Sequence, residues 1–110
     1  MLDRSSQFAV FAARSAWREA KLEPSATECD HIGVFVGTGM GGSLSMDEGY
    51  QTLYGEQSDR IKPMLVLMGM HNASAAWIAM EHALRGPSLT YSTACSSSAV
   101  ALGEAWLRIA

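Results

Sequence analysis

The chain has 110 residues, of which 48% are hydrophobic and 17% charged, a composition that excludes a disordered or fibrous protein and suits one small domain. Its formal net charge is −3, and no run of basic residues is present, which argues against nucleic acid as a partner. The longest apolar stretches fall short of the roughly 20 residues that a membrane span needs. Because the first residues also lack the pattern of a signal peptide, we expect a cytoplasmic protein that does not cross a membrane.

The first half of the chain predicts a helix, a strand and then a second helix. Apolar residues at helical spacing predict a helix over residues 5–21. Residues 32–36 (Ile-Gly-Val-Phe-Val) are typical of a short strand that is buried on both faces. A glycine-rich turn follows over residues 37–42 (Gly-Thr-Gly-Met-Gly-Gly), and residues 43–54 predict the second helix.

The second half repeats the alternation of helix and strand. Residues 55–62 are polar and predict a loop, and an apolar stretch runs over residues 63–70. An alanine-rich helix is expected over residues 72–84, a strand over 88–93, and a last helix over 94–109. This order indicates an α/β fold. Two strands make a small sheet, so we expect the 110 residues to be one part of a domain that is truncated at both ends.

The glycine turn has two interpretations. Gly37, Gly39 and Gly42 fit the G-x-G-x-x-G pattern of dinucleotide-binding proteins, directly after a predicted strand. That motif also needs an acidic residue at the end of a second buried strand, whereas the segment around Asp59 is wholly polar. We therefore expect these glycines, together with Gly41, to serve close backbone packing, and dinucleotide binding is the alternative.

Cys95 lies where the last predicted strand meets the last predicted helix. At a helix N-terminus, the dipole and the free backbone N–H groups stabilise a thiolate or an oxyanion, and the neighbours Ala94, Ser96 and Ser97 are small. Position alone allows two interpretations, a catalytic nucleophile or a small buried side chain. Cys29, between acidic residues, fits only the second. Neither cysteine has partners at metal-ligand spacing, so we expect no metal.

Three motifs together resemble a known family. They are residues 93–97 (Thr-Ala-Cys-Ser-Ser), residues 85–88 (Arg-Gly-Pro-Ser) and the glycine turn of residues 37–42. In this order they closely resemble the β-ketoacyl synthases of the thiolase-like fold, and most of all the acyl-carrier-protein enzymes (synthase II) that elongate fatty acids. The resemblance covers essentially the whole chain. It implies a layered α-β-α-β-α fold, of which residues 1–110 form part of the N-terminal half.

The resemblance also implies the roles of individual residues. Cys95 would take an acyl group from the phosphopantetheine arm of acyl carrier protein, and its backbone N–H would be one oxyanion donor. The acyl-enzyme would then condense with malonyl-carrier protein, with loss of CO2. Met40, Leu65 and Ala94 would line the acyl pocket, and no cofactor beyond the carrier's arm is implied. The family's catalytic histidines and lysine lie in its other half, so the chain alone is not expected to condense substrates.

The same resemblance implies two protein partners. They are acyl carrier protein and a second copy of the chain, which would pair through the strand of residues 88–93. Residues 68–71 (Met-Gly-Met-His) depart from the family's usual sequence, which suggests a synthase for polyene or polyketide chains as readily as one for fatty acids. The remaining alternative is a non-catalytic fragment that keeps only the dimer contact.

Overall fold

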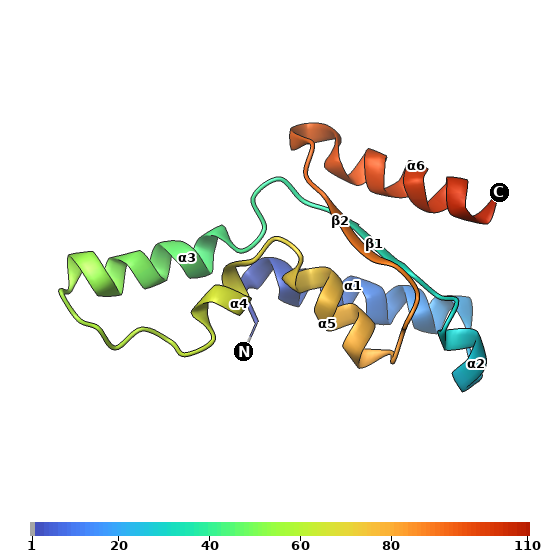
Figure 1. Ribbon diagram of the computed structural model, residues 1–110, viewed down its shortest axis with the longest axis horizontal. Helices are drawn as coiled ribbons and strands as arrows, with labels where there is room; N and C mark the ends of the chain where they lie inside the picture. The colour runs from blue at the N-terminus through green and yellow to red at the C-terminus, as the bar shows by residue number, and fades with distance from the viewer. Residues whose placement is uncertain (1) are drawn as a thin grey trace.

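The computed structural model of the chain describes residues 2–110, which form helices around a two-stranded sheet (Figure 1). The elements in chain order are α1 (Arg4–Ala20), α2 (Ala26–Cys29), β1 (Val34–Gly37), α3 (Ser43–Tyr50), the π-helical turn η1 (Gln51–Gly55), α4 (Leu65–Gly69), α5 (Ala73–Glu81), β2 (Ser88–Tyr91), the 3-10 turn η2 (Ala94–Ser96) and α6 (Ser97–Ile109). The strands are parallel, with Val34 opposite Ser88 and Gly37 opposite Tyr91. The expected α/β class is confirmed.

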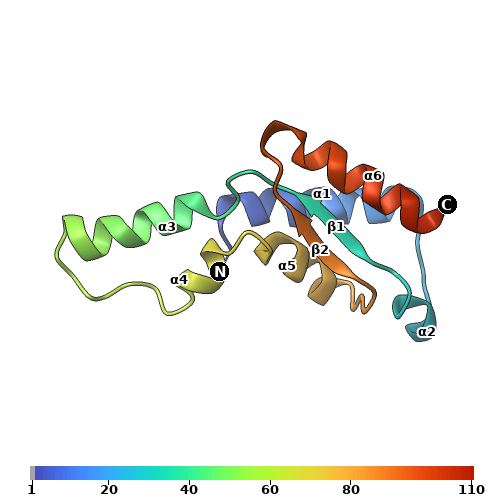
Figure 2. The same cartoon turned by 45° about the horizontal axis from the view of Figure 1, so that its top comes forward.

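The sheet lies between helices on both of its faces. Helix α6 covers one face, α5 covers the other, and α1 packs against α5 (Figures 1 and 2). The core is made mostly of small side chains, among them Val10, Val34, Ala75 and Ala101. Small side chains let helices and strands approach closely. The strand was expected to be buried on both faces, but only Val34 of β1 is buried and its other residues are partly exposed.

One buried carboxylate, that of Asp3, accepts hydrogen bonds from the first turns of two helices. Asp3 is 3% exposed and caps α1 by accepting a hydrogen bond from Ser5 N at 2.9 Å. It also accepts one from Ser45 N at 2.9 Å, in the first turn of α3. Burial by itself raises the pKa of this carboxyl, but hydrogen bonds from the hydroxyls and amides of Ser45 and Ser5 outweigh it and lower the pKa to about 2. Asp3 thus holds the starts of α1 and α3 together.

An arm made of α3, η1 and α4 extends away from the sheet (Figure 1, left), and the molecule measures 51 × 29 × 21 Å. The arm begins at Gly42, which has a φ of 88° in the left-handed region. A Cβ at Gly42 would lie 2.4 Å from the carbonyl oxygen of Gly69 at the end of α4. Only glycine satisfies both the conformation and the close approach, so this residue lets the arm fold back on itself.

The sequence did not predict the short helices α2 and α4, and the other elements differ from the expectations mainly at their ends. The first strand is shifted to Val34–Gly37, because only these residues have partners in β2. The helix expected over residues 43–54 runs as α3 and then widens into η1. The last helix starts with a 3-10 turn, so its α-helical part begins at Ser97. Within residues 2–110, no helix is long and apolar enough to cross a membrane.

Candidate active site

The glycine turn and the cysteine turn leave the same end of the sheet. β1 leads into the glycine turn, and β2 leads into the turn that carries Cys95 (Figure 2). The backbone N–H of Thr38 donates to the carbonyl oxygen of Tyr91 at 2.9 Å, which continues the pairing past β1. Binding sites of α/β proteins commonly lie beyond the carboxyl ends of parallel strands. The fold therefore brings together two motifs that are more than fifty residues apart in the sequence.

Gly37 allows β1 to end directly against α6. A Cβ on Gly37 would lie 2.2 Å from the carbonyl oxygen of Ser97, the first residue of α6. No side chain fits in that space, so the backbone at the end of β1 packs directly against the first turn of α6. A Cβ on Gly39 would lie 3.9 Å from the carbonyl oxygen of Ala94. The glycine turn is therefore a direct neighbour of the cysteine turn.

Hydrogen bonds hold the rest of the glycine turn in place. Gly41 N donates to Thr38 Oγ1 at 2.9 Å, and Gly42 N donates to Ser5 Oγ at 3.2 Å. The second bond joins the turn to the start of α1. Met40, the residue before Gly41, is 77% exposed. Gly37 and Gly42 lie where backbone groups pack closely, whereas a Cβ on Gly41 would meet the side chain of Thr38 and Gly39 has room for a Cβ.

The cysteine turn presents its thiol to the surface. Ala94, just before Cys95, has a φ of 53°, which is disfavoured for a residue with a Cβ. This sharp backbone turn reverses the chain between β2 and α6, and Cys95 is exposed. The interpretation of Cys95 as a buried side chain is therefore wrong. It is right for Cys29, which is 8% exposed.

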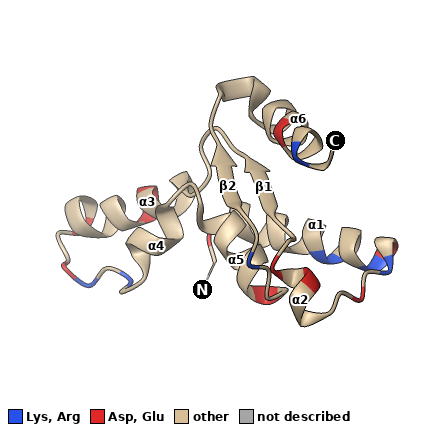
Figure 3. Cartoon of the chain, turned by 45° about the vertical axis from the view of Figure 1, so that its right-hand side comes forward, with Lys and Arg blue, Asp and Glu red and all other residues tan. Residues whose placement is uncertain are grey.

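The surroundings of both turns are uncharged. Residues 32–46 and 86–103 contain no Asp, Glu, Lys or Arg. Figure 3 shows the charged residues instead on α1, α2, α3, α5, the loop before α4 and the second half of α6. Neither turn therefore offers a charged side chain that could pair with a charged group of a ligand. In the part of the chain that the structure describes, no three His, Cys, Asp or Glu side chains gather as a metal site would require.

The structure groups three of the four expected acyl-contacting residues. Ala94, Cys95 and Met40 all lie on the two neighbouring turns. Leu65 lies apart from them, in the arm, where it is 9% exposed and packs against Gly49. It lines a separate hollow of about 140 Å³ between α3 and α4. Within this one chain, Leu65 is therefore not part of the surface around Cys95.

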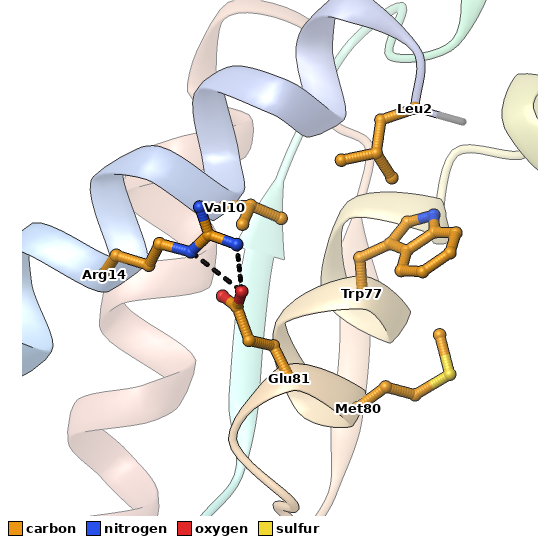
Figure 4. A pocket seen from close by; sticks show the side chains of 6 residues that line it. All are labelled: Leu2, Val10, Arg14, Trp77, Met80 and Glu81. Atoms are coloured by element: carbon orange, nitrogen blue, oxygen red, sulfur yellow. Dashed lines mark hydrogen bonds and ion pairs between the residues drawn. The ribbon is translucent and has the colours of Figure 1, made fainter.

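A second hollow, of about 440 Å³, lies between α1 and α5 (Figure 4). It is lined by Leu2, Val10, Arg14, Trp77, Met80 and Glu81. Arg14 Nε donates to Glu81 Oε1 at 2.8 Å, and this hydrogen bond lowers the pKa of the Glu81 carboxyl. The sequence offered no signal for this pair, because 67 positions separate the two residues. The pair links two packed helices and does not face the cysteine turn.

The comparisons with known proteins identify the family. Residues 1–110 match the model described as "Beta-ketoacyl synthase, N-terminal domain". The chain therefore belongs to the β-ketoacyl synthases, a family of acyltransferases with the thiolase-like fold.

Its relatives include two bacterial proteins named 3-oxoacyl-[acyl-carrier-protein] synthase 2. The one from Staphylococcus aureus is 30% identical over 105 residues, which is 96% of this chain and 26% of the relative. The one from Coxiella burnetii is 30% identical over 104 residues, which is 94% of this chain and 25% of the relative. The chain thus spans about a quarter of the length of these relatives.

Proposed function

We propose that Cys95 is the acyl-accepting nucleophile of a 3-oxoacyl-[acyl-carrier-protein] synthase. In the first step, the Cys95 thiolate attacks the carbonyl carbon of an acyl thioester on the carrier's phosphopantetheine. The bond to the pantetheine sulfur breaks, that sulfur leaves as a thiol after taking up a proton, and the acyl group stays on Cys95 Sγ. The observation that carries the proposal is the exposed thiol on a left-handed turn between β2 and α6.

The start of α6 supports this chemistry. The helix has 13 residues, long enough for its aligned peptide dipoles to favour negative charge at its N-terminus. Cys95 lies in the 3-10 turn just before this terminus. The attacking thiolate and the oxyanion that forms on the carbonyl both carry a negative charge, which the N-terminus of a helix favours. The residues of both turns are uncharged, so they place no fixed side-chain charge beside the acyl chain.

The second step needs groups that these 110 residues do not supply. Malonyl-carrier protein loses CO2, and the resulting carbanion attacks the Cys95 thioester, which yields a 3-oxoacyl product two carbons longer and frees the thiolate. His31 and His71 are exposed, and His82 is stacked on Trp17 with its ring centroid 4.3 Å away, at the end of α5. We assign none of the three to decarboxylation. We propose that histidines outside these residues perform it, in a protein as long as the relatives.

A mass measurement with two matched variants tests the first step. The chain is incubated with an acyl-pantetheine thioester, and the acylated residue is mapped by peptide mass spectrometry. We expect acylation of Cys95 in the unmodified chain and in Cys29→Ser, and none in Cys95→Ser. Failure to acylate Cys95 under conditions in which iodoacetamide alkylates it would contradict the proposal. Release of CO2 from malonyl-carrier protein by the chain alone would contradict the assignment of the second step.

The proposal includes two partners, acyl carrier protein and a second copy of the chain. β2 is paired with β1 along one edge, and Leu89 on β2 is 37% exposed. The edge of β2 that faces away from β1 is therefore suited to pair with the same strand of a second copy. We expect Leu89→Asp to lower the fraction of dimer in sedimentation, whereas Val66→Asp, an exposed position in the arm, serves as the control. A dimer that forms without acylation of Cys95 would favour a non-catalytic fragment.

Met40 is the residue of the site that we propose to limit acyl chain length. Its exposed side chain projects from the turn that faces Ala94. The test compares rates of Cys95 acylation for a series of acyl chain lengths in the unmodified chain and in Met40→Ala. We expect the shorter side chain to favour longer acyl groups. The departure of residues 68–71 from the family's usual sequence keeps polyene and polyketide chains among the substrates to be included.

A further inference from the structure

The hydroxyl of Ser97 lies inside the cysteine turn. Ser97 is 3% exposed and is the first residue of α6. Its Oγ accepts a hydrogen bond from Thr93 N at 2.9 Å and donates one to the carbonyl oxygen of Ala94 at 2.7 Å. One buried side chain therefore joins the residues on either side of the peptide bond that leads into the left-handed turn.

This turn needs support from its surroundings. Ala94 has a Cβ, so a φ of 53° is disfavoured and persists only where other contacts impose it. β2 ends at Tyr91, so the N–H of Thr93 lies beyond the paired strands. Ser97 itself cannot move back, because the end of β1 at Gly37 packs against its backbone. The packing of β1 therefore fixes the position of Ser97, and the hydrogen bonds of Ser97 in turn hold the cysteine turn.

The neighbouring hydroxyl of Ser96 is not equivalent. Its Oγ donates to the carbonyl oxygen of Thr93 at 2.7 Å, but the residue is exposed, so water can take its place. The hydroxyl of Ser97 is buried, and its loss leaves the Thr93 N–H without this partner. Because the hydrogen bond between Thr93 N and Ser97 Oγ is partly buried, an N–H left unpaired there is costly. The two serines after Cys95 therefore differ in what their removal does to the turn.

We propose that Ser97 is a positioning residue for Cys95. Its hydroxyl holds Ala94 in the left-handed conformation and so fixes the direction of the Cys95 thiol and backbone N–H toward an incoming thioester. The proposal rests on the proposed function of Cys95 as the acyl acceptor. It extends that function by assigning the geometry of the nucleophile to a buried side chain that does not touch the substrate.

Amide hydrogen exchange at Thr93 tests the hydrogen-bonded turn directly. We expect exchange to be about tenfold faster in Ser97→Ala, because a lost hydrogen bond corresponds to about a tenfold change in an opening equilibrium. Ser97→Thr keeps a hydroxyl and should restore slow exchange, and Ser98→Ala, at an exposed position of α6, should not alter it. Unchanged exchange in Ser97→Ala overturns the proposal. If that variant does not fold, fast exchange in a folded Ser97→Thr overturns it instead.

The second readout compares two reactions of the same thiol. Acylation by acyl-pantetheine depends on the direction of the thiol and the N–H, whereas alkylation by iodoacetamide needs only an accessible thiol. We expect Ser97→Ala to slow acylation about tenfold, in line with the hydrogen bond lost, and to leave alkylation within about twofold. Equal acylation rates in Ser97→Ala and the unmodified chain overturn the proposal. If the unmodified chain is not acylated, the proposed function fails, and the exchange at Thr93 still decides the role of Ser97.

Discussion

Replacing Asp3 by Asn should separate the starts of α1 and α3. The carboxylate of Asp3 accepts four hydrogen bonds, two from Ser5 and two from Ser45, at 2.6 to 2.9 Å. An amide of the same shape has one oxygen to accept and one nitrogen that only donates. At least one of the four donors then faces another donor. We expect Asp3→Asn to lower the free energy of unfolding by about 2 kcal/mol at neutral pH, as the pKa shift indicates.

The magnitude follows from the pKa of the carboxyl. The pKa falls from 3.8 to about 2 on folding, and a difference of nearly two units corresponds to about 2 kcal/mol. Because the folded state holds the proton less tightly than the unfolded state, this stability is fully present above the unfolded pKa. It is lost as the pH falls through about 2. The unmodified chain should therefore lose about 2 kcal/mol between about pH 5 and pH 1 from this residue alone.

Urea unfolding followed by circular dichroism at several pH values measures both effects. The Asn variant should start lower at neutral pH and lack this part of the acid-dependent loss. Asp47→Asn is the matched control, since Asp47 is exposed on α3, and it should change stability by less than about 0.5 kcal/mol. Equal stabilities of Asp3→Asn and the unmodified chain at pH 7, or parallel pH profiles of the two, would show that the Asp3 carboxylate does not stabilise the fold in this way.

Three further substitutions test the packing. Gly37→Ala places a methyl group where the Ser97 carbonyl lies 2.2 Å away and should lower stability by about 1–3 kcal/mol, so an unchanged melting temperature would be evidence against the close contact. Ser74→Ala removes the buried hydrogen-bond partner of Ser6 Oγ, 3.1 Å away, and should lower the free energy of unfolding in urea by about 1–2 kcal/mol. An unchanged free energy of unfolding would show that this hydrogen bond does not stabilise the fold. Gly103→Ala meets no atom within 4 Å and should stabilise α6 by about 0.5–1 kcal/mol, which a lower melting temperature would disprove.

Some expectations depended on neighbouring residues only, and these were largely met. Helical spacing located α1, α5 and most of α6, since each helix forms from a local pattern. The apolar run at residues 32–36 located β1 to within a few positions. Three motifs in the right order were enough to indicate the family to which the chain belongs. The boundary errors arise because strand ends depend on the partner strand, which a local pattern does not contain.

Local sequence patterns were enough to predict the α/β class, the order of the longer helices and the strands, and the position of Cys95 between a strand and a helix, but they missed the short helices α2 and α4. The packing of the whole chain exposes the Cys95 thiol and places Leu65 apart from it. It also brings Asp3 to the first turn of α3, where the carboxylate accepts two hydrogen bonds from Ser45. The physical reason is chain distance. Spacing within one element is set by backbone geometry, whereas exposure and hydrogen bonds between distant segments depend on how the whole chain packs.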